Sequence, residues 1–170
     1  MKIAFAGYNG FIGSSFIKTY PDYNYKYLSR ELLYSEPEKL AGAIEGADVV
    51  ISLTGYPIIK RWTAKNRSLI RKSRIEVNRN LAEAIQSGPH KPELFVSASA
   101  IGIYNNTGIH QETSTGYGSG FMSDVVKDWE ESTSNIRDVT GVAYLRTGMV
   151  LGNGGGAFPI LKKTTKTGLG

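Results

Sequence analysis

The sequence predicts an α/β fold in which a parallel sheet carries helices on both faces. Short apolar runs typical of buried strands alternate with stretches of helical periodicity, which is the pattern of successive βαβ units. A glycine-rich turn, Gly7-Tyr-Asn-Gly-Phe-Ile-Gly13, follows the first apolar run directly and opens the first helix. The chain of 170 residues has the size of one domain, so we expect a single unit over residues 1–170.

The apolar runs and the helical periodicity predict the elements in order. The expected strands are rich in β-branched or aromatic residues and cover Lys2–Ala6, Tyr25–Leu28, Asp48–Leu53, Leu94–Ala98 and Val142–Arg146. The expected helices cover Phe11–Thr19, Pro37–Glu45, Ala64–Ser87 and Ser119–Ile136, with a last one over Ala157–Lys166. Thr63 is placed to cap the third helix. Residues 105–120 form a long polar connection of the kind that carries a site on a rigid scaffold.

The composition excludes several classes of site. The chain has no cysteine, so thiol nucleophiles, disulfides, iron–sulfur clusters and zinc–thiolate sites are excluded. Two histidines and scattered carboxylates give no ligand spacing, and no metal site is predicted. No stretch approaches the roughly 18 apolar residues of a membrane span. The N-terminus lacks the pattern of a signal peptide, so we expect a cytoplasmic protein.

The net charge of +5 favours an anionic small ligand over nucleic acid. The basic residues concentrate in residues 60–79, and no nucleic-acid-binding module is recognisable. The alternative is a contact with nucleic acid through Lys60, Arg61, Lys65, Arg67, Arg71 and Lys72, which would weaken steeply with salt. A solvated helix face is the favoured interpretation of this run.

The glycine turn predicts a Rossmann-type dinucleotide site. The first glycine permits the tight turn, the second lets the backbone approach a pyrophosphate, and the third lets helix and strand pack closely. Backbone N–H groups and the positive end of the helix dipole then favour phosphate. The residues of the turn expected to bind cofactor are Gly7, Asn9, Gly10, Phe11, Ile12 and Gly13. The alternative is a turn that merely joins strand to helix.

The end of the second strand favours NADP over NAD. An acidic residue there binds the ribose 2′-hydroxyl, whereas an arginine accommodates a 2′-phosphate. The sequence reads Leu28-Ser-Arg30, which favours NADP, and Glu31 keeps NAD as the alternative.

Four segments together resemble an atypical short-chain dehydrogenase/reductase of the NAD-dependent epimerase/dehydratase superfamily. They are GYNGFIG, SLTGYPI with RWT and SRIEVN, SASAIGIY, and LRTGMVLGNGGG. More narrowly, the chain is similar to the epimerase-like family 39U of this superfamily. The resemblance implies that Leu53, Thr54 and Gly55 lie near the adenosine and phosphate half of the cofactor. It also implies a catalytic role for Ser99, with Ser97 beside it, and contacts of Thr147 to Val150 with the nicotinamide.

The YxxxK motif of the superfamily is missing. Its tyrosine and lysine positions hold Met122 and Val126, neither of which transfers a proton, and Lys127 points about 100° away on the helix. The asparagine of the usual tetrad is matched by Arg74, which also lies on the packing stripe of its helix. Ordinary tyrosine-based epimerisation is therefore not expected.

The remaining polar residues suggest a different site for an oxidoreductase of unknown substrate. Ser99 and Arg74 would polarise a carbonyl, with the proton supplied by water, Glu112, Tyr104 or His110. The alternative is a non-catalytic protein that senses NADP. Relatives continue well beyond the point where this sequence ends, so we expect the C-terminal substrate subdomain to be absent. Apolar surface left bare by that absence favours self-association, for example as a homodimer.

Overall fold

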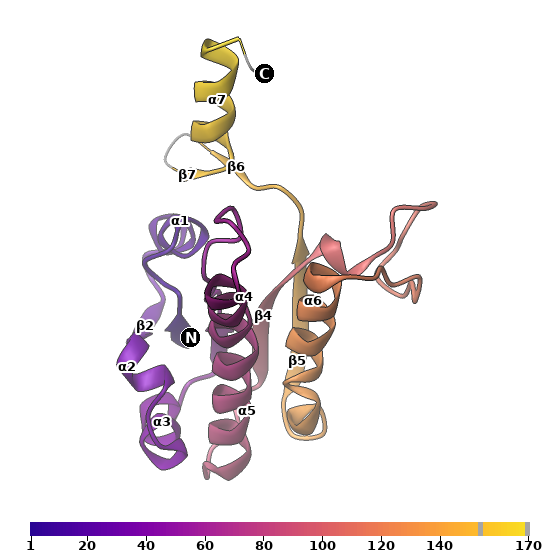
Figure 1. Cartoon of the computed structure of the whole chain (residues 1–170). Helices are drawn as coiled ribbons and strands as arrows, with labels where there is room; N and C mark the ends of the chain where they lie inside the picture. The colour runs from indigo at the N-terminus through magenta and orange to yellow at the C-terminus, as the bar shows by residue number, and fades with distance from the viewer. Residues whose placement is uncertain (153–154, 169–170) are drawn as a thin grey trace.

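The protein is described here by a computed structural model, which covers residues 1–152 and 155–168. Its main sheet has five parallel strands in the order β2-β1-β3-β4-β5 (Figure 1). The strands are β1 (Lys2–Ala6), β2 (Asn24–Leu28), β3 (Val49–Ser52), β4 (Leu94–Ala100) and β5 (Gly141–Thr147). Each lies within a few residues of its predicted range, so the prediction of a parallel sheet is confirmed.

The strand order shows that the sheet is doubly wound. The chain passes from β1 outward to β2, and then crosses back to place β3 on the other side of β1. This order is one of the two common orders of doubly wound sheets, and ligands bind where the winding direction reverses, beyond the carboxyl ends of the strands. The glycine turn follows β1 and therefore lies at this switch point.

Helices cover both faces of the sheet, as predicted. They are α1 (Phe11–Thr19), α2 (Arg30–Leu33), α3 (Pro37–Ile44), α4 (Ala64–Arg71), α5 (Val77–Ser87), α6 (Phe121–Glu131) and α7 (Phe158–Lys166). The larger core cluster joins α2, α3 and α5 to one face, around Val50 and Phe95. On the other face, Phe16 and Ile17 of α1 pack against the smaller cluster, which contains Phe5. The apolar residues that alternate along the strands thus supply both cores.

The predicted helix Ala64–Ser87 is interrupted. A π-helical segment, Lys72–Glu76, separates α4 from α5. The apolar residues spaced along one face of this helix are nevertheless all buried: Ile70, Val77, Leu81 and Ile85. Thr63 caps α4 by accepting a hydrogen bond from the Asn66 N–H, as predicted. The prediction of one regular helix is wrong in its middle, since periodicity alone does not reveal an extra residue in a turn.

Three further differences concern short elements. The predicted helix Ser119–Ile136 ends at Glu131, and a separate 3₁₀ turn covers Ser134–Ile136. Helix α2, whose first turn is capped by the Ser29 hydroxyl, was not predicted. A small antiparallel hairpin of β6 (Leu151–Gly152) and β7 (Gly155–Gly156) was not predicted either.

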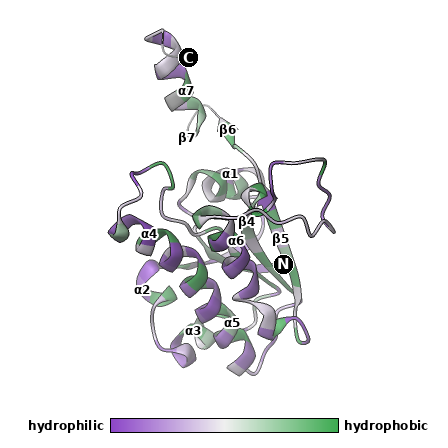
Figure 2. Cartoon of the chain, turned by 45° about the vertical axis from the view of Figure 1, so that its right-hand side comes forward, coloured by the Kyte–Doolittle hydropathy of each residue, from purple (hydrophilic) through white to green (hydrophobic). Residues whose placement is uncertain are grey.

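The C-terminal part of the chain lies apart from the sheet. The hairpin glycines pack against the ring of Phe11, so a Cβ at Gly152 or Gly155 would lie 2.5 Å from a ring atom. Beyond the hairpin, α7 stands away from the other helices in both views (Figures 1 and 2). Figure 2 also shows hydrophilic residues along the outer sides of α4 and α6. Within the described ranges, no helix is long and apolar enough to cross a membrane.

Candidate cofactor groove and active site

The glycine turn is built so that only glycine fits at two of its positions. Gly7 has a φ of +85°, and a Cβ there would lie 2.6 Å from the Leu53 carbonyl. A Cβ at Gly13 would lie 2.4 Å from the Gly7 carbonyl oxygen. The first position supplies the left-handed turn, and the second lets α1 start close beneath β1. Both roles were expected from the sequence.

A groove of about 540 Å³ opens beyond the carboxyl ends of β1, β2 and β3. Seven of the residues predicted to bind cofactor line it, namely Gly7, Asn9, Gly10, Arg30, Leu53, Thr54 and Gly55. The other predicted cofactor residues lie elsewhere. Gly13 is buried beneath the turn, Ile12 is exposed, and Phe11 contacts the hairpin glycines. Thr147 ends β5 and Val150 follows it, at the opposite edge of the sheet from β2.

Arg30 and Glu31 both line the groove at the end of β2. The Glu31 carboxylate is stabilised by its own backbone N–H, by the Ser29 hydroxyl and by the charge of Arg30, which lowers its pKa. Arg30 is exposed, and no carboxylate among the described residues lies within ion-pair distance of it. The groove therefore offers an unpaired guanidinium where a ribose 2′-phosphate would lie.

The π-helical segment clamps the loop that forms one wall of the groove. The Thr54 hydroxyl donates to the Ser73 carbonyl at 2.9 Å, and the Tyr56 N–H donates to the Ser73 hydroxyl at 2.8 Å. Single π-turns inside α-helices often occur at functional sites, and here Ser73 of the π-turn holds the loop through both its carbonyl and its hydroxyl. This irregular turn, which was not predicted, thus fixes Thr54 of the predicted cofactor site and Tyr56 close to it.

Arg74 lies in the same π-turn and is held by neutral groups. Its Nη1 donates to the carbonyls of Tyr56 and Ile70, at 3.1 and 3.2 Å. The guanidinium carbon lies 5.3 Å from the centre of the Trp129 ring. Burial lowers the pKa of Arg74 to about 10. The catalytic role predicted for Arg74 beside Ser99 stays a prediction, and among the described residues no hydrogen bond joins the two side chains.

A buried polar bridge beneath the site was missed by the sequence analysis. Asn78 accepts a hydrogen bond from the Ser52 hydroxyl and donates one to Ser97 Oγ, both at 2.7 Å. All three side chains are fully buried. Asn78 therefore joins α5 to β3 and β4 inside the fold, and Ser97, predicted to contact cofactor, is one of its two partners. An asparagine on the packing stripe of a helix was the available signal, because a buried amide needs several partners.

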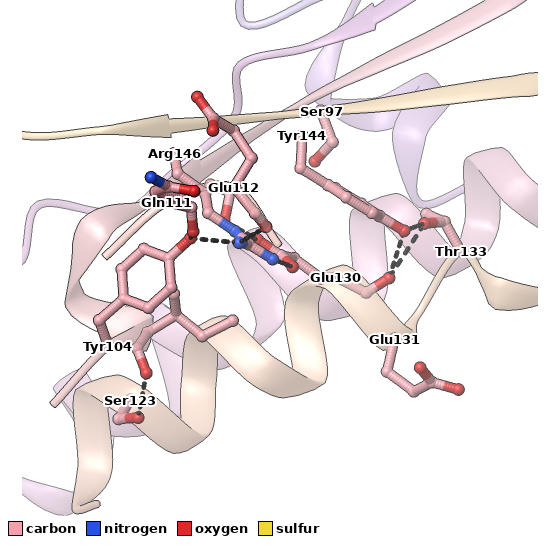
Figure 3. Close-up of polar contacts among 12 residues, drawn as sticks. Ser97, Tyr104, Gln111, Glu112, Ser123, Glu130, Glu131, Thr133, Tyr144 and Arg146 are labelled. Carbon is pink, nitrogen blue, oxygen red and sulfur yellow. Dashed lines mark hydrogen bonds and ion pairs between the residues drawn. The ribbon is translucent and has the colours of Figure 1, made fainter. Parts of the chain in front are cut away.

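Ser99 bonds to the largely buried ion pair of Glu130 and Arg146. Figure 3 shows this pair with Tyr104 and Glu112 beside it. The Ser99 hydroxyl donates to Glu130 Oε1 at 2.5 Å. The Glu130 carboxylate accepts two bonds from the Arg146 guanidinium, at 2.8 and 2.7 Å. This paired geometry raises the pKa of Arg146 above its ordinary value. Ser99 is thus held with its proton directed at a carboxylate and its lone pairs available to accept.

The loop after β4 is tied to this network. Arg146 Nη1 donates to the Tyr104 hydroxyl at 2.5 Å and to the Glu112 carbonyl at 3.1 Å. His110 stacks on the Tyr104 ring, with 4.7 Å between ring centres. The Glu112 side chain is exposed. Of the three proton donors considered from the sequence, Tyr104 and His110 thus hold the loop together, and Glu112 contributes its backbone to the network.

The positions of the missing YxxxK motif carry no proton donor. Val126 is buried and Met122 is half-buried on α6. The Lys127 amine contacts Asp124 of the same helix at 2.9 Å and the Gly118 carbonyl of the preceding loop at 3.4 Å. The geometry agrees with the expectation that Lys127 does not replace the lysine of the motif.

Known proteins share the sequence and the fold over this whole region. No family model matches the chain. The epimerase family protein SSP1921 of Staphylococcus saprophyticus is 33% identical over 172 residues, covering 92% of this chain and 57% of its own length. The human epimerase family protein SDR39U1 is 30% identical over 138 residues, covering 78% of this chain and 47% of its own length.

A solved structure extends the likeness to three dimensions. The crystal structure of human SDR39U1 (isoform 2) with NADPH superposes on the whole chain with a TM-score of 0.86 at 27% identity, and 61% of that protein is covered. The chain therefore spans about half the length of the curated relatives it matches. The sequence identity and the superposition agree, and over the part that it covers the chain is similar to the SDR39U1 epimerase family of the short-chain dehydrogenase/reductases.

Proposed function

We propose that this chain binds NADP and forms the nucleotide-binding unit of an epimerase/dehydratase-like oxidoreductase that lacks the YxxxK motif. The observation that carries the proposal is the groove at the switch point, which combines the glycine turn with the unpaired guanidinium of Arg30. The NADPH bound to human SDR39U1 supports the choice of cofactor. NAD remains the less favoured cofactor. A cytoplasmic location and assembly as a homodimer stay predictions.

The residues assigned to chemistry in this proposal are those around Ser99. A bound reduced dinucleotide supplies a hydride to a carbonyl carbon of a small substrate. The Ser99 hydroxyl donates its hydrogen bond to Glu130. It must break this bond before it can donate to the carbonyl oxygen of the substrate. Water or Glu112 supplies the proton in this scheme, because the Tyr104 hydroxyl already donates to the Gln111 carbonyl.

A calorimetric titration with NADPH, NADP, NADH and NAD tests the cofactor assignment. We expect the two phosphorylated forms to bind more tightly. Arg30→Ala should weaken NADPH binding by about 10- to 100-fold, the value of a charged hydrogen bond, and leave NADH binding nearly unchanged. Arg79→Ala, on the exposed side of α5, is the matched control and should change neither. Equal affinity for NADH and NADPH would reject the preference for NADP.

A non-catalytic NADP sensor is the second candidate. It is favoured by the apolar Met122 and Val126 at the YxxxK positions. NADPH carrying deuterium on the nicotinamide ring separates the two candidates when it is incubated with a panel of aldehydes and ketones. Deuterium in an alcohol product supports the enzyme. The sensor is supported if NADPH protects the backbone amides of the groove from hydrogen exchange and no deuterium is transferred to any carbonyl compound.

A further inference from the structure

The two arginines that point into the fold differ in how their charges are compensated. Arg146 is neutralised by the two oxygens of Glu130. Arg74 has no carboxylate within ion-pair distance among the described residues, and its contacts are carbonyls, the Ser73 hydroxyl and the Trp129 ring. An uncompensated charge removed from water costs several kcal/mol. A fold that keeps such a charge is suited to an anion that arrives from outside.

The guanidinium of Arg74 also has free hydrogen-bonding capacity. Its recorded hydrogen bonds to the described residues all use Nη1. Nη2 faces Gly55, at 2.9 Å from the position that a Cβ would take there. A side chain at Gly55 would therefore displace this group. The Nη2 and Nε edge of the planar fork is the one that binds the two oxygens of a carboxylate or phosphate.

The Arg74 guanidinium lies between the wall of the groove and α6. Gly55, Tyr56 and Ser73 line the groove, and Arg74 lies directly against them. On its other side lies Trp129, which precedes the Glu130 that holds Ser99. The indole N–H of Trp129 is buried and finds no acceptor among the described residues.

We propose that Arg74 anchors an anionic group, a carboxylate or a phosphate, between the cofactor groove and Ser99. Two sources have this chemistry: the substrate of the proposed enzyme, and the phosphates of the dinucleotide. The inference rests on the proposed function where it identifies an anionic substrate. The anion site itself does not depend on that function. At neutral pH the guanidinium keeps its charge, since burial lowers its pKa only to about 10.

Trp129 gives a local signal for the test. The chain has two tryptophans, so Trp62→Phe leaves the emission of Trp129 alone. In this background, inorganic phosphate and malonate are titrated into the free protein and into the protein saturated with NADPH. We expect a saturable change in emission that weakens about 10-fold or more in Arg74→Gln and less in Arg74→Lys, which keeps the charge but loses the fork. Arg79→Gln is the control, and thermal unfolding verifies that each variant is folded.

The titrations with and without NADPH distinguish the sources. Anion binding that persists in the NADPH-saturated protein and depends on Arg74 identifies a substrate site. Anion binding that NADPH abolishes, together with about 10-fold weaker NADPH binding in Arg74→Gln, identifies a cofactor phosphate. If the protein binds anions through Arg74 but no dinucleotide, the proposed function fails and the anion site stands. Equal anion and NADPH affinities in Arg74→Gln, Arg74→Lys and the parent would overturn the proposal.

Discussion

Gly13→Ala is expected to lower the free energy of unfolding by about 3 kcal/mol, the upper part of the usual range for overpacking. The added methyl group would lie 2.4 Å from the Gly7 carbonyl oxygen, and the nearby atoms on Tyr8 are also backbone. No side-chain rotation relieves this contact, so α1 must move away from β1. Thermal unfolding followed by circular dichroism should show a midpoint lowered by roughly 6–12 °C.

The same movement should affect the cofactor. The turn between Gly7 and Gly13 forms one end of the groove. If α1 is displaced, its first N–H groups no longer point at a bound phosphate. We therefore expect Gly13→Ala to bind NADPH weakly even at temperatures where it is folded. Calorimetry below the midpoint measures this separately from stability.

Gly42 of α3 supplies a matched control for the same substitution. A Cβ at Gly42 would meet no other atom within 4 Å. Gly42→Ala should therefore stabilise the protein by about 0.5–1 kcal/mol, because alanine is the better helix former. Equal midpoints for Gly13→Ala and Gly42→Ala would show that the close approach of α1 to β1 is not what requires glycine at position 13.

Much of the fold could be predicted because its signals are local. Buried parallel strands are continuous apolar runs, as at Val49–Ser52, and the glycine turn follows a strand at once. Residues 7–13 and Arg30 were placed by the same logic, because the loops that end adjacent parallel strands meet at one edge of the sheet. The prediction of a binding site at this edge therefore followed from the order of the strands and their loops along the chain.

The rest of the site depends on contacts between residues distant in the sequence. Glu130 and Arg146 are separated by 16 positions, and nothing in either segment indicates that they pair. Asn78 meets Ser52 only because α5 packs over β3. The π-turn that contains Ser73 interrupts the 3.6-residue period only once. The spacing of the apolar residues therefore does not reveal it. Tertiary packing decides each of these features.

Glu130→Gln is expected to destabilise the protein by about 3 kcal/mol, since it leaves the Arg146 charge buried without its partner. The Glu130 side chain is 10% exposed and that of Arg146 is 19% exposed, so water compensates little of the loss. Chemical denaturation at constant temperature measures this change. Asp128→Asn is the control, because the Arg71–Asp128 pair is 45% and 48% exposed and such surface pairs contribute about 0–1 kcal/mol.

The same substitution should loosen the loop after β4. Arg146 holds this loop through the Tyr104 hydroxyl and the Glu112 carbonyl, so an Arg146 without Glu130 moves and releases both contacts. Limited proteolysis should then cleave residues 105–117 faster in Glu130→Gln than in Asp128→Asn. Replacing Arg146 by methionine as well should recover part of the lost stability, because no buried charge remains, but not the protection of the loop. A double variant no more stable than Glu130→Gln would show that the uncompensated charge of Arg146 is not the cause of the destabilisation.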